Sequence, residues 1–309
     1  MNKTKSNSSS IASTNSIGNQ KRSTGKIEQI LTGFPFYLKN KPVVAVLRLS
    51  GVIGKVSNYK NGLTIENLNE LIEKSFGIQK LIALCLAINS PGGSPVQSEL
   101  IAKRIIDLSK EKNIPVYSFV EDVAASGGYW LACAGNKIYA SRSSIIGSVG
   151  VVSSSFGFQE AIGKLGIERR IYTEGKNKSI LDPFQPVRAE DIKIIKKLQK
   201  QIHGHFINYV KERRGGRLTQ NDEVLFNGEF WAGDSALDFG LIDGIADMYG
   251  FIKENFGEDI KIEHITPKQS WFKKKLGMNM NAEAISEEIV SKAVETVENK
   301  LIKSKFNLF

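Results

Sequence analysis

The sequence has few residues that cross-link a protein or anchor it in a membrane. Its 2 cysteines, Cys85 and Cys133, lie inside apolar patterns without the spacing of a metal site or a disulfide framework. We therefore expect reduced, buried cysteines and no metal. No apolar run reaches the roughly 18 residues of a membrane-spanning helix, and the N-terminus lacks the apolar stretch of a signal peptide. These absences predict a cytoplasmic chain without a transmembrane helix.

Acidic residues are outnumbered, 32 against 42 basic ones, which gives a net charge of +10. Such an excess is typical of a nucleic-acid partner, of contact with an anionic membrane, or of a lysine-rich solvated surface. The lysines are scattered over predicted helix faces, without interleaved aromatic side chains on which bases could stack. We therefore expect no nucleic-acid partner, while peripheral membrane contact and a solvated surface both stay open.

The two ends of the chain differ in composition from its middle. Residues 1–27 are rich in serine and asparagine and contain no acidic residue, which predicts a disordered basic segment; a transit peptide is the alternative. Residues 268–309 are predicted to form a linker and an amphipathic tail helix, whose apolar residues include Ile285, Ile289, Val290, Ala293, Val297 and Leu301. Residues 28–267 remain as one α/β domain.

Strand and helix patterns alternate from residue 43 onward, which predicts βαβ units and a mostly parallel sheet. Strands are expected at 43–51, 81–89, 114–122 and 167–175, and helices at 64–76, 94–112, 126–135, 158–166 and 189–215. The helix at 94–112 is expected to have Leu100, Ile101, Ile105 and Leu108 on one face. Ligand sites of such sheets lie beyond the carboxyl ends of the strands. The turns after the second and third strands should therefore share one edge of the sheet.

Ser126 occupies one of these turns, within the run AASGG. A serine at a helix start is most often an N-cap. The small neighbours would also let a substrate backbone approach the hydroxyl, and a helix N-terminus offers free N–H groups to an oxyanion. Ser126 is therefore a candidate nucleophile as well as a candidate cap.

The other turn is NSPGGS, residues 89–94. A strand that ends in Ser-Pro-Gly-Gly makes a sharp turn whose glycine N–H groups can point at an anion. The N–H group of Gly93 is the leading candidate for an oxyanion donor. Ser90 is a competing candidate nucleophile.

A nucleophilic serine needs a general base, and histidine is the usual one. None of the 3 histidines, His203, His205 and His264, lies in a glycine-rich turn. Lysine is the other base for serine, and lowering its pKa from about 10.4 to near 7 costs about 4–5 kcal/mol, so it needs a dry pocket. Lys176 and Lys178 lie between a predicted strand and a proline-fixed loop, where either would otherwise be a solvated loop lysine.

Four stretches, taken in order, resemble the signal peptide peptidase A family of serine peptidases in its short, single-repeat form. They are INSPGGS at 88–94, DVAASGGYW at 122–130, SIIGSVGVV at 144–152 and GKNKSILDPFQP at 175–186. The resemblance covers residues 43 to about 265. It implies an α/β fold like that of Clp protease and the crotonases, a spiral of ββα units with a mostly parallel sheet, and an activity without a cofactor.

The resemblance also implies roles for single residues. Ser126 matches the nucleophile, Lys178 rather than Lys176 matches the general base, and Ser148 matches the residue that helps to hold the lysine. Gly93 and Gly127 match the oxyanion donors. In double-length relatives the serine and the lysine come from different halves of the chain, so a single-length chain is expected to form a homo-oligomer with its sites between subunits.

The substrates implied are peptides, either remnant signal peptides or other apolar or misfolded polypeptides. Small apolar side chains would fit a pocket that we predict to be lined by Val151, Val152 and Phe156. Many relatives carry an N-terminal membrane anchor that this sequence lacks, so the basic ends and the tail helix are candidates for membrane contact, and the tail helix equally for subunit packing. The alternatives are a crotonase-type acyl-CoA enzyme and a non-catalytic scaffold of the same fold.

Overall fold

The computed structural model describes residues 41–55 and 62–266. The predicted disordered N-terminus and the tail helix lie outside these residues. The described part is built around an 8-stranded sheet in which β6, β5, β3, β2, β1 and β8 lie in this order, and β4 bridges β3 and β7. The strands are β1 Val43–Ser50, β2 Leu81–Ser90, β3 Val116–Ala125, β4 Lys137–Ala140, β5 Ile145–Gly147, β6 Phe230–Ala232, β7 Gly244–Ile245 and β8 Lys261–Ile265.

The sheet is mostly parallel, as the alternation of strands and helices predicts. β1 pairs in parallel with β2 and β8, and β2 pairs in parallel with β3, so the three longest strands lie side by side. β5 continues beside the end of β3, and β6 pairs with β5 as the antiparallel edge strand. Because β2 and β3 are parallel neighbours, the turns that follow them lie at one edge of the sheet.

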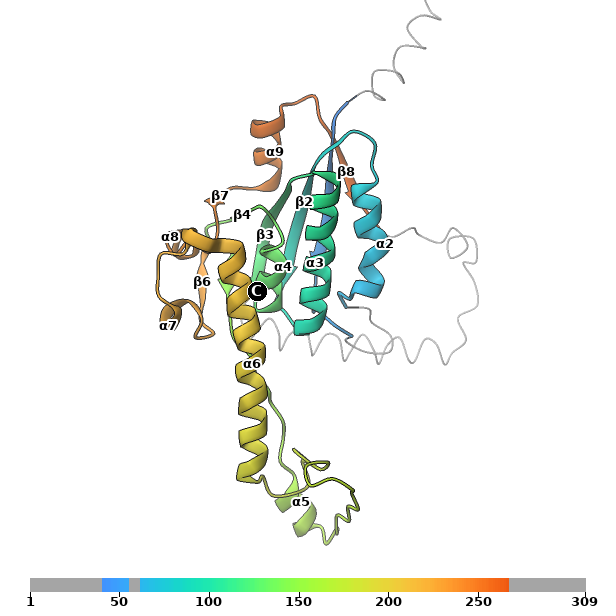
Figure 1. Cartoon of the computed structure of the whole chain (residues 1–309), viewed down its shortest axis with the longest axis vertical. Helices are drawn as coiled ribbons and strands as arrows, with labels where there is room; N and C mark the ends of the chain where they lie inside the picture. The colour runs from blue at the N-terminus through green and yellow to red at the C-terminus, as the bar shows by residue number, and fades with distance from the viewer. Residues whose placement is uncertain (1–40, 56–61, 267–309) are drawn as a thin grey trace, which may run out of the picture. The chain divides into compact units, whose positions relative to one another are not determined.

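Helices cover both faces of the sheet (Figure 1). They are α2 Ile65–Phe76, α3 Pro95–Lys112, α4 Gly127–Ala132, α5 Gln159–Lys164, α6 Ala189–Arg214, α7 Asp222–Leu225, α8 Gly233–Asp238 and α9 Met248–Phe256. α2, α3 and α4 pack on the face formed by alternate residues of β1 and β2, and α9 packs on the opposite face. No helix in the described ranges is long and apolar enough to cross a membrane.

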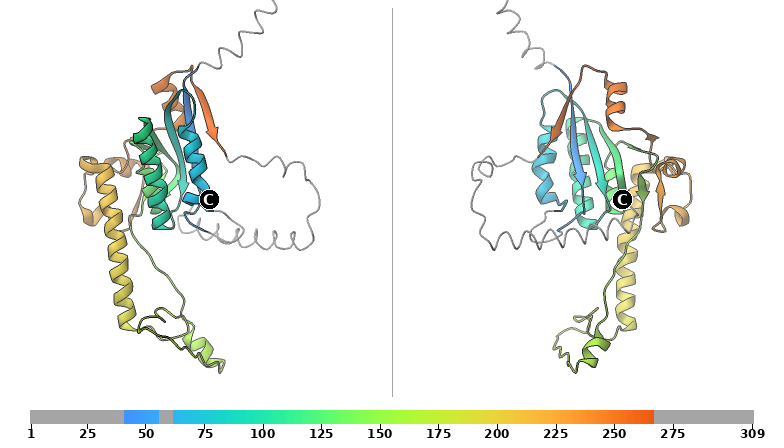
Figure 2. Two further views of the ribbon diagram at one scale, coloured as in Figure 1. Left: turned by 45° about the vertical axis from the view of Figure 1, so that its right-hand side comes forward. Right: turned by 180° about the vertical axis from the view of Figure 1, so that it is seen from behind.

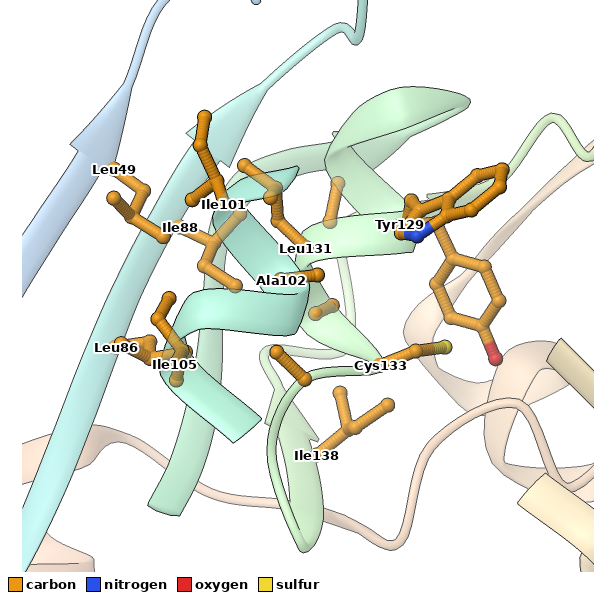
Figure 3. Close-up of a cluster of buried hydrophobic side chains, with 14 of the residues drawn as sticks. Leu49, Leu86, Ile88, Ile101, Ala102, Ile105, Tyr129, Leu131, Cys133 and Ile138 are labelled. Atoms are coloured by element: carbon orange, nitrogen blue, oxygen red, sulfur yellow. The ribbon is translucent and has the colours of Figure 1, made fainter. Parts of the chain in front are cut away.

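The larger core lies between the sheet and α3 and α4 (Figure 3). Ile101 and Ile105 of α3 are fully buried, whereas Leu100, which we expected on the same face, is exposed. The buried stripe of α3 is therefore narrower than its apolar pattern. Cys85 and Cys133 are buried and free, as expected. Burial raises the pKa of the Cys85 thiol to about 12 and that of Cys133 to about 11, so neither forms a thiolate near neutrality.

The strand predicted at 167–175 is wrong, because these residues form no strand. Residues 167–175 are β-branched and aromatic in part, but most of them are exposed. β-propensity measures how well a side chain fits a pleated, half-buried surface. Without a neighbouring strand, this segment stays irregular.

α6 connects two different surroundings. Near its C-terminus, Phe206, Val210 and Arg214 are buried, and the ring of Phe206 stacks on Trp130 of α4. Near its N-terminus most side chains are exposed. Both views in Figure 2 show α5 and the loop before α6 at the N-terminal end of α6, which points away from the sheet. The predicted proline-fixed loop therefore lies apart from the α4 contact.

Candidate active site

Ser126 lies between β3 and α4 in a strained turn, with φ 53° and ψ −123°. Its N–H donates to the Gly147 carbonyl at 2.8 Å, and its own carbonyl accepts from the amides of Tyr129 and Trp130. It occupies the N-cap position of α4, yet within the described chain its side chain makes no capping hydrogen bond. Ser126 is half-buried, and its hydroxyl makes no hydrogen bond with another described residue. The N-cap interpretation is therefore confirmed for the position of Ser126 but not for a capping hydrogen bond.

The NSPGGS turn packs directly against Ser126, and its glycines make that approach possible. A Cβ on Gly92 would lie 2.8 Å from the Ser126 Cβ and 2.8 Å from the Gly127 nitrogen. A Cβ on Gly93, whose φ is 145°, would overlap the carbonyl oxygen of Ile53. Only glycine fits at these two positions.

Two backbone N–H groups next to Ser126 are available to a ligand. Ile53 pairs with both neighbours of Gly93: its N–H donates to the Gly92 carbonyl, and its carbonyl accepts from Ser94, each at 2.8 Å. The N–H of Gly93 therefore faces the other side. Gly127 is the first residue of α4 and has no acceptor within the helix. Neither amide donates a hydrogen bond to another described residue.

Ser90, the competing candidate nucleophile, is fully buried. Its Oγ accepts a hydrogen bond from the Gly92 amide at 3.2 Å. The Ser90 carbonyl also lies where a Cβ on Gly128 would have to fit. These contacts give Ser90 a structural role in the turn, out of reach of a substrate.

A cavity of about 20 Å³ adjoins Ser126, Gly93 and Gly127. Its apolar wall is formed by Pro95, Trp130, Val151, Ile202 and Phe206. Of the three residues that we predicted to line a substrate pocket, Val151 lines this cavity. Val152 and Phe156 do not line it, and they are 79% and 78% exposed. Side chains of an irregular segment do not follow the alternation of a strand, so the sequence did not separate Val151 from its neighbours.

Ile202 and Phe206 were missed by sequence reasoning. They lie four residues apart on one face of α6, which is the spacing of an ordinary buried helix face. Such a pattern shows which residues are buried together but not which part of the chain they contact. The sequence therefore contained no signal that would have assigned them to the site.

Lys178 is exposed, and its backbone N–H donates to the Gly175 carbonyl at 3.0 Å. It belongs to the loop before α6, which Figure 1 shows beside α5 and away from α4. Ser148 lies next to the Ser126 turn, with φ 53° and its N–H donating to the backbone carbonyl of Glu229 at 2.6 Å. One chain thus brings together Ser126, Gly93, Gly127 and Ser148 but leaves Lys178 apart.

The histidines do not complete a Ser-His-Asp triad. His203 lies on α6, where its Nε2 is 3.0 Å from the Val149 carbonyl oxygen. His205 is exposed, and His264 of β8 lies 3.5 Å from the Tyr249 hydroxyl. No hydrogen bond links a histidine to Ser126 among the described residues, and no cluster there is arranged to hold a metal.

Comparison with protein families gives a match to peptidase family S49 over residues 109–255. Over 245 residues the chain is 48% identical to a Brucella melitensis protein named Na(+)/H(+) antiporter NhaA. That match covers 78% of this chain but 33% of that protein, so the activity in its name is not carried over. The chain likewise spans 46% of a putative signal peptide peptidase SppA of Enterococcus faecium, to which it is 32% identical.

A relative of similar length is the putative protease SohB of Buchnera aphidicola. It is 30% identical over 243 residues, which cover 77% of this chain and 68% of that protein. Among solved structures, a membrane-bound stomatin-specific protease has a TM-score of 0.46 and 16% identity, covering 74% of this chain and 99% of that one. The family match includes Ser126 and the elements from β3 into α9. The chain belongs to peptidase family S49.

Proposed function

We propose that the chain is a serine endopeptidase with Ser126 as nucleophile and Lys178 as general base. The observation that carries the proposal is the Ser126 turn, where an uncommitted hydroxyl lies beside two N–H groups without acceptors. Membership in a peptidase family supports peptide-bond hydrolysis. Acyl transfer needs a nucleophile and an oxyanion site in this relation to each other.

In the proposed mechanism neutral Lys178 accepts the Ser126 proton while Oγ attacks the substrate carbonyl carbon. The carbonyl oxygen becomes an oxyanion that accepts hydrogen bonds from the Gly93 and Gly127 amides. The protonated lysine then gives its proton to the leaving amine, and an acyl ester remains on Ser126. Water, deprotonated by the same lysine, hydrolyses that ester.

We place this site between two copies of the chain. Lys178 is exposed in one chain and lies in a segment with several exposed apolar side chains, among them Leu165, Ile167 and Tyr172. Large exposed apolar side chains gathered in one segment are typical of a protein interface. A second copy would bury this surface and bring its Lys178 to Ser126 of the first chain, where Ser148 would help to hold the amine.

The proposed substrates are polypeptides cut after a small apolar residue. A cavity of about 20 Å³ with an apolar wall has room for little more than a methyl group. Remnant signal peptides fit this limit where a small residue lies within their apolar stretch. Other apolar or misfolded polypeptides meet the same requirement.

The crotonase-type alternative is less well supported. A drug-sized or cofactor ligand occupies a pocket of about 300–1,000 Å³. The cavity beside Ser126 is far smaller. A non-catalytic scaffold is disfavoured because the serine, the oxyanion amides and the lysine are all present.

Ser126→Ala and Lys178→Ala test the proposal on a fluorogenic peptide with alanine at the cleaved position. Each substitution is expected to lower kcat at least about 1,000-fold, the scale seen when one member of a catalytic unit is removed. Lys176→Ala, a change at an exposed neighbour in the same loop, is the matched control and should keep the activity. Full activity in Ser126→Ala or Lys178→Ala would remove that residue from the mechanism.

A further inference from the structure

The segment 147–151 leaves the sheet beside Ser126 and is held at successive points. The Gly147 carbonyl accepts from Ser126, and the Ser148 amide donates to Glu229, which extends the pairing between β5 and β6. Beyond Ser148 the strand pairing ends. Val149, the next residue, is fully buried. Its backbone carbonyl therefore needs a hydrogen-bond donor from within the protein.

His203 supplies that donor from α6. Its Nε2 lies 3.0 Å from the Val149 carbonyl oxygen, and the imidazole is partly buried. A carbonyl only accepts, so Nε2 is the protonated nitrogen. This bond ties the segment to the helix at the point where the next two residues, Gly150 and Val151, line the cavity beside Ser126.

The same turn of α6 forms the opposite wall of that cavity. Ile202 precedes His203, Phe206 follows it by three residues, and both line the cavity. On its other side Gly150 packs against Gly228, where an added Cβ would come within 3.1 Å of the Gly228 Cα. The His203 bond therefore sets the distance between the two walls.

We infer that His203 is a positioning residue that determines which side chain the enzyme accepts next to the cleaved bond. The inference rests on the proposed function, because it assigns the cavity to the substrate residue before the cleaved bond. When the bond to Val149 is absent, Val151 relaxes away from Ile202, and the cavity accepts larger side chains. His203 takes no part in proton transfer.

The test compares four single variants by their kcat/KM for two fluorogenic peptides, one with alanine and one with leucine at the cleaved position. His203→Leu removes the donor, and His203→Asn places its amide too close to the main chain to reach Val149. His203→Gln keeps an N–H near the position of Nε2. His205→Leu is the matched control on the same helix, because His205 is exposed.

The leucine-to-alanine ratio is expected to rise about fivefold or more in His203→Leu and His203→Asn, within the range that one methylene changes in an apolar pocket. His203→Gln and His205→Leu should stay within about twofold of the unmodified protein, since each keeps the bond to Val149. Amide hydrogen exchange of residues 149–152 should quicken in the first pair only.

An unchanged ratio in His203→Leu and His203→Asn overturns the inference, and so does a His203→Gln variant that behaves like His203→Leu. Ser126→Ala, assayed alongside, separates the two proposals. If it keeps full activity, the proposed function is wrong, and the specificity role of His203 is overturned with it. If it is inactive, the ratios and the exchange rates decide the role of His203.

Discussion

At the scale of single residues, the site depends on backbone conformations that most side chains avoid. Ser126 has a positive φ, and so does Ser148, the residue that follows β5. Each such conformation of a residue other than glycine costs about 1–3 kcal/mol and persists only where the surroundings enforce it. At Ser126 the Gly147 carbonyl, the first turn of α4 and the NSPGGS turn all do so.

Gly93→Ala is expected to lower the free energy of unfolding by about 3 kcal/mol or more, because its Cβ would overlap a backbone carbonyl that cannot move freely. Gly204→Ala is the matched control. Gly204 lies inside α6 with open space around the added methyl group, so this change should stabilise the protein by about 0.5–1 kcal/mol. Urea unfolding of both variants checks the prediction, and equal stabilities would contradict it.

At the scale of elements, arginines at the C-terminal end of α6 and just beyond it connect this end to the residues after α4 and to Asp243. Arg213 donates to the carbonyls of Cys133, Ala134 and Gly135, which follow α4. Arg214 and Arg217 both contact the Asp243 carboxylate. Cations at a helix C-terminus satisfy its last carbonyls and oppose the negative end of its dipole. α4 is thus held at its far end while its N-terminus presents Ser126.

Asp243 makes this junction sensitive to acid. Burial alone would raise the pKa of Asp243, but hydrogen bonds from Arg214, the Ile138 amide and Arg217 hold that pKa below its ordinary value. A carboxyl group whose pKa is lower in the folded than in the unfolded state stabilises the protein at pH values above its unfolded-state pKa of about 3.9. This stabilisation is lost as the pH falls through the pKa of the folded state. The free energy of unfolding should therefore fall below about pH 4.

Asp243→Asn should remove this acid dependence and lower the free energy of unfolding at neutral pH by about 3–5 kcal/mol, because Arg214 would be left buried without a counter-charge. Asp234→Asn is the matched control, since Asp234 forms an exposed pair with Arg142. Denaturant unfolding between pH 3 and 7 measures both. An Asp243→Asn variant whose stability falls with acid as steeply as that of the unmodified protein would contradict the account.

At the scale of the whole molecule, the proposed dyad needs two copies of the chain, because Lys178 lies apart from Ser126 in one copy. The apolar surface around α5 and the start of α6 is exposed, and the exposed lysine lies within it. Exposed apolar side chains are costly for a lone chain and ordinary for one that associates. In the proposed mechanism the described chain supplies the nucleophile and the oxyanion site, and a second copy would supply the general base.

Leu165→Asp is expected to lower the mass of the particle and, with it, the peptidase activity, because a buried charge opposes association. Leu100→Asp, a change at an exposed leucine of α3, should leave the mass unchanged. Light scattering coupled to size-exclusion chromatography measures both. Equal masses for the two variants would contradict an interface around α5.

The sequence predicted the parts of the molecule in which local pattern and packing agree. β1, β2 and α2 follow their periodicity, and the strand-to-helix turn at Ser126 was recognisable from its small residues. The strand at 167–175 was predicted wrongly because propensity says nothing about whether a partner strand exists. The wall formed by Ile202 and Phe206 depends on where α6 packs, which a helical pattern does not encode.

The central claim is that Ser126 of one copy works with Lys178 of another, and complementation between inactive variants tests it most directly. Ser126→Ala and Lys178→Ala are each expected to be inactive alone. When the two are dissociated, mixed and reassembled, sites that combine an intact Ser126 with an intact Lys178 should form, and activity should return to about a quarter of the unmodified level for random pairing. Mixed particles, confirmed by mass spectrometry, that show no activity would contradict the account.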